Sequence, residues 1–224
     1  MEKTGWKALE SNPDTINPFL AKIGVTGIEC VDVYSFDDEM LQFVPKPQLA
    51  MMLCFPSNQA REYLDEKYEE ALKTPRDKKI FFMKQNKEIG NACGTFALLH
   101  SIANLEDRVD IGKGSFKKWL ESVRDATEEE RCDLLAGDSD LAGAHDETAE
   151  DGETEQTDDV EYHFIAYVNI KGELYEIDSC APFPIKYGST TDETLVKDAG
   201  IVINQMLDRV PGLNISALAL VGKI

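Results

Sequence analysis

Hydrophobic residues recur along the chain with two different periods, which indicates that helices and strands are mixed. Apolar positions at helical spacing follow Asn12-Pro13-Asp14 and Cys93 and predict two helices. A polar, mostly exposed helix is predicted over Gln59 to Lys73, and a further helix over Thr191 to Leu207. Short apolar runs typical of buried strands occur at Cys30 to Tyr34, Leu49 to Phe55, Ile80 to Met83 and Ile215 to Val221. The pattern therefore predicts an α+β fold.

A β-hairpin is predicted between residues 163 and 178. His163 opens an apolar strand that runs to Ile170, Lys171-Gly172 supplies a two-residue turn, and a second strand leads to Asp178. This turn pairs Ile165 with Asp178. Because side chains alternate between the two faces of a strand, His163 and Asp178 become diagonal neighbours on one face, within hydrogen-bonding reach. A slip of one residue would place them on opposite faces.

The chain has 224 residues, of which 42% are hydrophobic, and this is enough for one domain with a single core. Its net charge of −19 would repel phosphate backbones, so nucleic acid is not an expected partner. The segment between Cys132 and Ile170 contains 12 acidic residues and no Lys or Arg. Its core, Ala136 to Glu161, is poor in apolar residues, which predicts a solvated or disordered loop, either functional or a simple linker.

The cysteines indicate a reducing compartment. They are odd in number and widely spaced, with no C-x-x-C pair, so neither a disulfide framework nor a metal-ligand set is expected: Cys30, Cys54, Cys93, Cys132 and Cys180. No signal peptide is recognisable, and the longest apolar stretch, Leu49 to Phe55, is too short to cross a membrane. We therefore expect a cytoplasmic protein with no cofactor, no metal and no membrane partner.

Cys93 is the candidate nucleophile. The run Gly90-Asn91-Ala92-Cys93-Gly94 passes from a polar turn into an apolar helix, so the sulfur would lie at the N-terminus of that helix. Free backbone N–H groups and the helix dipole lower the pKa of a thiol at such a position. A buried and inert cysteine fits the same pattern.

Of the three histidines, His163 alone suits the role of a base for this thiol. His100 lies on the same predicted helix, about 10 Å beyond Cys93 along its axis. His145 falls in the predicted acidic loop, where nothing would hold its ring. His163 would take the thiol proton, and Asp178 would orient the imidazole. Without a nucleophile nearby, a satisfied strand-end histidine and a capping aspartate would fit equally well.

Two amide side chains shortly before the nucleophile are candidates for stabilising an oxyanion. Gln85 and Asn86 could each join the backbone N–H of Cys93 in that role. Ordinary polar loop residues would fit the same positions.

Five runs around these residues form a recognisable pattern: Phe82 to Gln85, Ile89 to Thr95, His163 to Ala166, Leu174 to Asp178 and Pro182 to Ile185. Further matching runs are Trp6, Leu9 to Pro13, Val31 to Tyr34, Thr191 to Leu195 and Ser216 to Leu220. Together they closely resemble the small ubiquitin C-terminal hydrolases. The resemblance implies these roles: Cys93 as nucleophile, His163 as base, Asp178 as its orienter, Gln85 as oxyanion stabiliser and Leu9 in substrate binding.

The resemblance also implies a fold and an activity. The fold is a papain-like single domain over residues 1–224, with a central, mainly antiparallel sheet flanked by helices, a knotted backbone, and an acidic crossover loop, residues 136–161, above the active site. Members of this family are deubiquitinating thiol proteases. They hydrolyse esters, amides or peptides at the C-terminal glycine of ubiquitin, in some cases of ubiquitin-like modifiers, and release small or unfolded adducts. An acidic surface complements the basic face of ubiquitin.

The sequence departs from the family pattern at two places. Seven residues separate Gln85 from Cys93, and the offset at which the family places its glutamine holds Lys87. After Asp178 the family tends to have glycine and a basic residue, whereas Ser179-Cys180-Ala181 stand here.

Two other classes of protein fit part of the pattern. A ubiquitin-binding module without turnover is the main alternative, and the complete set of triad residues argues against it. A thiol redox or metal-binding protein is the second, and it lacks paired cysteines. The sequence ends soon after the last predicted strand, so a small free-standing enzyme is implied.

Overall fold

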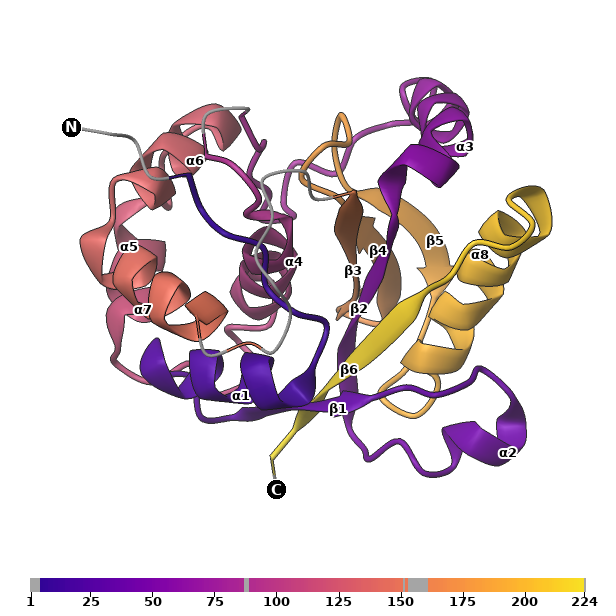
Figure 1. The fold of residues 1–224 in the computed structure, drawn as a ribbon, viewed down its shortest axis with the longest axis horizontal. Coiled ribbons are helices and arrows are strands. Elements are labelled where there is room, and N and C mark those ends of the chain that lie inside the picture. Colours follow the sequence, from indigo (N-terminus) through magenta and orange to yellow (C-terminus); the bar gives the residue numbers. More distant parts are fainter. Residues whose placement is uncertain (1–4, 87–88, 151, 153–160, 224) are drawn as a thin grey trace.

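One antiparallel sheet organises the part of the chain that the computed structural model describes, residues 5–86, 89–150, 152 and 161–223. Its six strands are β1 (Ile28–Asp32), β2 (Gln48–Pro56), β3 (Tyr162–Ile170), β4 (Glu173–Ile177), β5 (Ile185–Ser189) and β6 (Ser216–Gly222). They lie in the order β1-β6-β2-β3-β4-β5, and each neighbouring pair is antiparallel (Figure 1). The predicted α+β class with an antiparallel sheet is confirmed.

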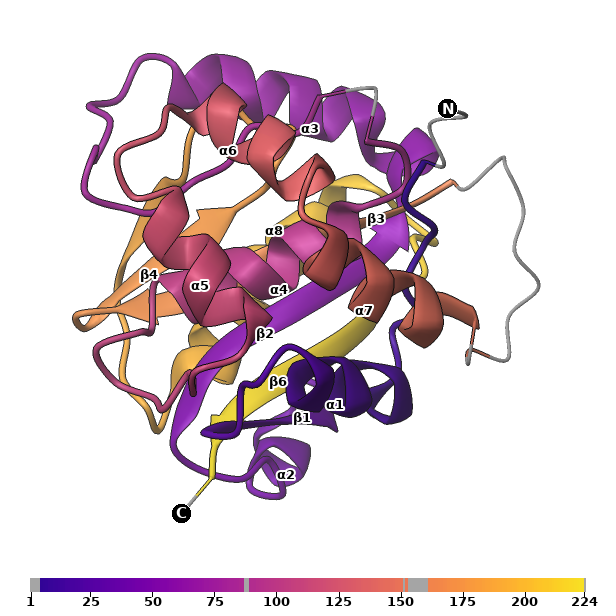
Figure 2. The same cartoon turned by 90° about the vertical axis from the view of Figure 1, so that its left-hand side faces the viewer.

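Helices cover both faces of this sheet. They are α1 (Pro13–Lys22), α2 (Asp38–Leu41), α3 (Ser57–Ala71), α4 (Cys93–Ala103), α5 (Ser115–Ser122), α6 (Glu128–Ala136), α7 (Ser139–Glu150) and α8 (Leu195–Arg209). Helix α4 packs against β3 and β2 on one face, and α5 to α7 lie outside it (Figure 2). Helix α8 packs against the opposite face (Figure 1). Within the described residues, no helix is long and apolar enough to cross a membrane.

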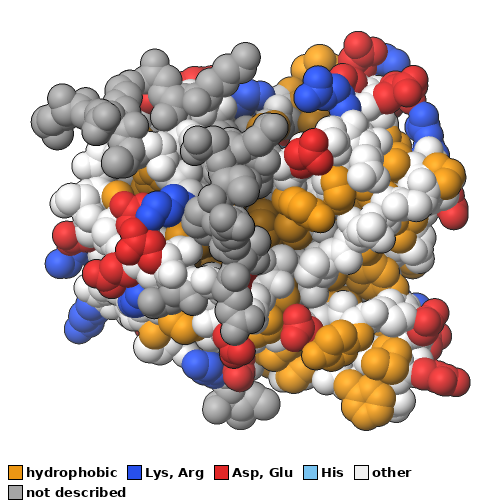
Figure 3. All heavy atoms as spheres, in the orientation of Figure 1, with side chains coloured by type: hydrophobic (Ala, Val, Ile, Leu, Met, Phe, Trp, Pro, Cys, Tyr) orange, Lys and Arg blue, Asp and Glu red, His pale blue; other side chains and the backbone are white. Residues whose placement is uncertain are grey.

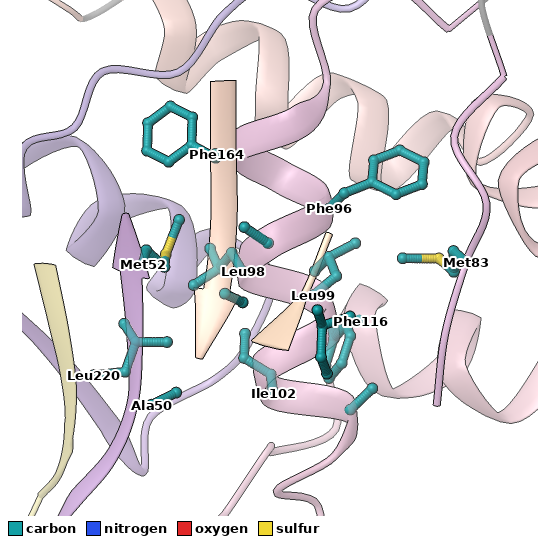
Figure 4. Close-up of a cluster of buried hydrophobic side chains, with 14 of the residues drawn as sticks. Ala50, Met52, Met83, Phe96, Leu98, Leu99, Ile102, Phe116, Phe164 and Leu220 are labelled. Atoms are coloured by element: carbon teal, nitrogen blue, oxygen red, sulfur yellow. The ribbon is translucent and has the colours of Figure 1, made fainter. Parts of the chain in front are cut away.

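Helix α4 is the centre of the larger hydrophobic core. Every residue of this helix is buried, because the sheet covers one side and the outer helices cover the other. Leu98 and Ile102 of α4 lie near Met52 of β2, Phe164 of β3 and Leu220 of β6 (Figure 4). This packing fixes the height and angle at which the first turn of α4 meets the sheet.

Most of the predicted elements are present. The helix expected after Asn12 begins at Pro13, where the Asn12 side chain accepts a hydrogen bond from the Asp14 N–H at 2.9 Å. The predicted strands at Leu49 to Phe55 and Ile215 to Val221 correspond to β2 and β6.

The predicted hairpin is confirmed in its register. Lys171 and Gly172 have positive φ angles of 54° and 83°, as a two-residue hairpin turn requires. Ile170 pairs with Glu173, and Ala166 pairs with Ile177. Asp178 therefore follows β4 at the position predicted to face His163 across the hairpin.

The strand predicted at Ile80 to Met83 is wrong. The segment pairs with no strand among the described residues, because the side chains of His100 in α4 and of Asn104, the residue after α4, take up its backbone groups. Asn104 accepts a hydrogen bond from the Phe81 N–H at 2.8 Å and donates to the Phe81 carbonyl at 2.9 Å, and His100 accepts from the Met83 N–H at 2.9 Å. An apolar run held in this way needs no neighbouring strand.

The loop predicted at residues 136–161 is also wrong over much of its length, since residues 139–150 form helix α7. Asp138 accepts a hydrogen bond from the Leu141 N–H at 2.9 Å and starts the helix. Four side chains at helical spacing are buried against α1 and the neighbouring helices: Leu141, His145, Thr148 and Ala149. Residues 151 and 153–160 of the predicted loop lie outside the described residues.

His145, expected to be solvated, is instead fully buried. Its Nδ1 lies 2.8 Å from the hydroxyl of Thr95 in the first turns of α4, and its ring packs against Trp6 with centroids 4.6 Å apart. Burial lowers the pKa of His145 to about 4. One side chain thus joins α7 to the N-terminal part of α4.

The buried His145 should make the protein sensitive to acid. Because its pKa is lower in the folded state than in the unfolded state, the unfolded chain takes up the proton first as the pH falls. The resulting loss of unfolding free energy should begin near pH 6.5, reach about 3 kcal/mol, and be complete near pH 4. Urea unfolding between pH 7 and pH 4 measures this slope.

His145→Gln keeps an amide that can bond to Thr95 but does not titrate, so its slope should be smaller than that of the unmodified protein. Asp140→Asn, at an exposed position of the same helix, is the control and should leave the slope unchanged. Equal slopes for His145→Gln and the unmodified protein would contradict the prediction.

Candidate active site

Cys93 is the first residue of α4, as the sequence predicts. Its side chain is 9% exposed, and its sulfur lies 4.0 Å from the carbonyl oxygen of Tyr162, where β3 begins. The first backbone bond of the helix runs from the Phe96 N–H to the Ala92 carbonyl, so earlier N–H groups point out of the helix end. The sulfur therefore lies between a helix N-terminus and the first residues of β3.

His163 and Asp178 meet beside this sulfur. The Nε2 atom of His163 lies 2.8 Å from the Oδ1 atom of Asp178, which confirms the hydrogen bond predicted from the hairpin. The imidazole also interacts with the Cys93 side chain, which raises the pKa of His163. Since Nε2 faces the carboxylate, Nδ1 is the nitrogen left for the sulfur. The imidazole ring and the Phe55 ring form a T-shaped pair with centroids 6.0 Å apart.

Asp178 is 1% exposed and accepts hydrogen bonds on both oxygens. Oδ1 accepts from His163 and from the Cys180 N–H, the latter at 2.7 Å, and Oδ2 accepts from the Tyr68 hydroxyl of α3. Burial alone would raise the pKa of Asp178, but the imidazole and the two other donors outweigh it and lower the pKa to about 2. Asp178 is therefore a fixed negative charge at neutral pH.

This charge determines the state of the imidazole. Burial lowers the pKa of His163, but the Asp178 carboxylate and the contact with Cys93 outweigh it and raise the pKa well above the usual 6.5. A thiol, an imidazole and a carboxylate in this order can transfer a proton from sulfur to nitrogen and stabilise the resulting charge.

Gln85 is held by two loops that flank the nucleophile. Its Nε2 donates to the Gly90 carbonyl at 3.0 Å, and its Oε1 accepts from the Ser179 hydroxyl at 2.8 Å. The backbone N–H of Gln85 also donates to the Ser179 carbonyl at 3.0 Å. Asn86, the other amide, instead donates to Asp133 of α6 at 2.8 Å. Lys87 lies outside the described residues. Of the two amides, Gln85 is therefore the one held beside the nucleophile.

Leu9, predicted to bind substrate, is 5% exposed and belongs to the core. It packs against the first turn of α4, where a Cβ atom on Gly94 would lie 3.3 Å from the Leu9 Cβ.

His100 is buried among Phe82 and Phe96, and burial lowers its pKa to about 3. His100 and His145 are therefore structural residues.

The other cysteines differ from Cys93 in their surroundings. Burial raises the pKa of Cys30 and of Cys54 to about 12, and it also raises the pKa of Cys132. Cys180 is exposed and lies beside the His163–Asp178 pair.

Two residues at this site, Tyr68 and Cys180, were not among the predicted site residues. Tyr68 lies 110 positions before its partner Asp178 and is one of several polar or aromatic residues on α3. The same helix is tied to β4 by Lys67, whose Nζ lies 2.5 Å from a carboxylate oxygen of Glu176. Only the docking of α3 against the hairpin brings Tyr68 to the carboxylate.

Comparisons with known proteins agree with the resemblance drawn from the motifs. The family model described as "Ubiquitin carboxyl-terminal hydrolase, family 1" matches residues 6–208. Ubiquitin carboxyl-terminal hydrolase 3 of Arabidopsis thaliana is 39% identical over 220 residues, covering 96% of this chain and 93% of the relative. Ubiquitin carboxyl-terminal hydrolase isozyme L1 of Homo sapiens is 37% identical over 218 residues, covering 96% of this chain and 97% of the relative.

A solved structure has the same fold. It is the catalytic domain of UCH37 from Trichinella spiralis bound to ubiquitin vinyl methyl ester, with a TM-score of 0.76 and 20% sequence identity. The match covers 98% of this chain and 96% of that chain.

Tyr68 should act as a positioning residue for Asp178. In Tyr68→Phe the carboxylate loses a donor, so its pKa should rise and the acid limb of Cys93 alkylation by iodoacetamide should move to higher pH. A hydrogen bond to a charged group is worth roughly 1.5–3 kcal/mol, so a shift of about one pH unit is expected. Alkylation rates between pH 1 and pH 8, a range that includes the Asp178 pKa of about 2, are read by mass spectrometry at Cys93 and measure this shift.

Tyr63→Phe is the matched control, because Tyr63 lies on the same helix and packs against Lys67 and Arg209 without contacting Asp178. Its acid limb should stay in place. An unchanged limb in Tyr68→Phe, with reduced stability towards urea, would show that Tyr68 only packs.

Proposed function

The chain belongs to family 1 of the ubiquitin carboxyl-terminal hydrolases and is a deubiquitinating cysteine protease, and on this premise we propose that it acts through an acyl-enzyme on Cys93. The substrates are esters, amides or peptides joined to the C-terminal glycine of ubiquitin, and ubiquitin-like modifiers with the same tail are a second group. The observation that carries this proposal is the 2.8 Å contact of His163 with Asp178 beside the Cys93 sulfur.

The reaction takes place in two steps. Cys93 attacks the carbonyl carbon of the terminal glycine while His163 takes the thiol proton, and the imidazolium then gives this proton to the departing amine or alcohol. In the second step His163 takes a proton from water, which attacks the thioester and releases ubiquitin. Asp178 keeps the ring oriented and balances its charge in both steps.

Gln85 is proposed to stabilise the oxyanion together with the backbone N–H of Cys93. Its anchoring at Gly90 and Ser179 supports this role, because both partners belong to the loops beside the nucleophile. The helix N-terminus adds positive potential at the same place.

We also propose that residues 1–224 form a single catalytic domain with a papain-like fold and a knotted backbone. Strand β1 from near the start of the chain pairs with β6 from near its end, which supports one domain. A nucleophile at the start of α4, packed against a strand that carries the base, supports the papain-like arrangement.

Ubiquitin is proposed to bind through an apolar area around α2. Tyr34 and Phe43 are 82% and 73% exposed, and hydrophobic side chains gather over α2 (Figure 3). A cavity of 260 Å³ lies next to them, lined by Val33, Phe36 and Ala217 among others. Exposed aromatic residues beside a small cavity are typical of protein-binding surfaces. The acidic surface of the chain and Leu9 are further proposed contributors to binding.

The proposal for Cys93 predicts a separation of binding from chemistry. Cys93→Ala should lower turnover of a fluorogenic ubiquitin ester by about 10⁴-fold or more, because no other group can form the acyl-enzyme. Binding of ubiquitin should change little, since it is spread over a surface. Steady-state kinetics gives the turnover, and calorimetry gives the affinity for ubiquitin.

Cys54→Ala is the control. Cys54 lies on β2, near Cys93, but it is buried and its pKa is raised. It should keep its turnover. Turnover in Cys93→Ala equal to that of the unmodified protein would refute the mechanism.

The segment that leads into β3 is proposed to cross over the active site and limit the size of the leaving group. Its last residue, Glu161, is anchored by the Ser57 N–H at 2.8 Å and lies two positions before His163. Helix α7 ends at Glu150, so the segment from Glu150 to Glu161 can span at most about 40 Å. A folded domain of about 76 residues has a half-girth of about 46 Å. The chain cannot arch over such a domain, so small or unfolded adducts are the expected leaving groups.

Native enzyme should therefore hydrolyse a small ubiquitin ester much faster than isopeptide-linked diubiquitin. A Gly-Ser insertion after Gly152 should raise the rate on diubiquitin, because lengthening a flexible loop costs little free energy. The rate on the small ester serves as the internal control and should not change. Similar rates on both substrates with the native segment would exclude a size limit.

A further inference from the structure

The Cys180 thiol lies next to the two residues that are proposed to serve the nucleophile. One ring nitrogen of His163, one carboxylate oxygen of Asp178 and the sulfur of Cys180 all lie within 4.8 Å of one another. In the described part of the chain, no other three His, Cys, Asp or Glu side chains have their ligand atoms within this distance of one another. The spacing of the cysteines along the sequence had indicated no such set.

The loop after β4 holds this thiol in place through its backbone. The Cys180 N–H donates to Asp178 at 2.7 Å, and the Ala181 N–H donates to the Asp178 carbonyl at 3.0 Å. From the other side, Lys84 donates to the Ala181 carbonyl at 2.7 Å, and Ser179 is bonded to Gln85. Cys180 is an exposed residue, and these hydrogen bonds fix the backbone that carries it.

The three side chains are of the types that bind Zn²⁺ in proteins. Imidazole nitrogen, thiolate sulfur and carboxylate oxygen are the ligands of Zn²⁺, whereas Mg²⁺ and Ca²⁺ require oxygen. In a tetrahedral zinc site, neighbouring ligand atoms lie about 3.4 Å apart. The three atoms now lie within 4.8 Å of one another, so the side chains must draw closer together to bind one ion. The net charge of −19 also attracts cations to the surface.

We propose that Cys180, His163 and Asp178 form a binding site for Zn²⁺ through which the ion inhibits the enzyme reversibly. Water occupies the fourth position of the ion. On binding, the Cys180 thiol and the Nε2 atom of His163 each release a proton to water, and the ion takes the place of the hydrogen bond between His163 and Asp178. The imidazole is then turned and held by the metal, so it no longer exchanges a proton with Cys93. This inference rests on the proposed function only for its effect on turnover, since binding of the ion itself needs no catalysis.

Metal binding can be tested without activity, in the full chain carrying Cys93→Ser and kept reduced with a phosphine. Titration with Co²⁺ as a spectroscopic probe should give one equivalent of tetrahedral Co²⁺ with a thiolate-to-cobalt charge-transfer band, and Zn²⁺ should displace it. Adding Cys180→Ser should abolish the band. Adding Cys54→Ser instead, as the matched control, should leave the band in place. Absence of the band in Cys93→Ser would overturn the proposed site.

The effect on turnover is measured with the Cys93 thiol intact. Zn²⁺ should inhibit hydrolysis of a ubiquitin ester, and chelation should restore the rate. Even partners outside the first ligand sphere change metal affinity by about 10-fold or more, so Cys180→Ser should raise the Zn²⁺ concentration for half-inhibition by at least that factor. Equal half-inhibition in Cys180→Ser and unmodified enzyme would mean that Zn²⁺ acts at Cys93 alone, and would overturn the inhibitory role. If the cobalt band is present but the unmodified enzyme cleaves no ubiquitin ester, the proposed function is refuted and the metal site still stands.

Discussion

The hydrogen bond between His163 and Asp178 is the interaction on which the rest of the site depends. Asp178 is a charge buried almost completely, and a buried carboxylate is tolerated only when its oxygens are paired. The imidazole supplies one partner, and the Tyr68 hydroxyl and the Cys180 N–H supply the others. The arrangement therefore stabilises the fold and the charged imidazole together, and a change in any donor alters both.

The second constraint is the burial of α4 between the sheet and the outer helices. Because every residue of α4 is covered, the helix has little freedom to slide or tilt, and its first residue stays beside the first residues of β3. The same burial distinguishes the thiols. Cys30 and Cys54 lie on strands with pKa values of about 12, whereas Cys93 lies at a helix end next to an imidazole. Reactivity in this molecule follows from position in the fold.

Two failures of prediction have a common physical cause. Residues 80–83 have the composition of a strand, yet His100 of α4 and Asn104 just after it make hydrogen bonds to the backbone of Met83 and Phe81. Residues 139–150 have the composition of a solvated loop, yet four side chains on one stripe are buried. In both segments, contacts with a distant part of the chain outweighed the local preference. His145, placed in solvent by the composition of its segment, is buried against Thr95 and Trp6 for this reason.

The sequence by itself determined what depends on neighbouring residues. Alternation along two strands and a two-residue turn were sufficient to predict that His163 and Asp178 share a face, and a polar turn before an apolar run was sufficient to place Cys93 at a helix start. The motifs also identified the family, because they are specific and span nearly the whole chain. The tertiary structure decided the rest. Tyr68 reaches Asp178 from α3, and Gln85 is joined to Ser179 across the site. Such contacts join residues far apart along the chain, and no local period records them, because they arise only when separate elements dock against one another.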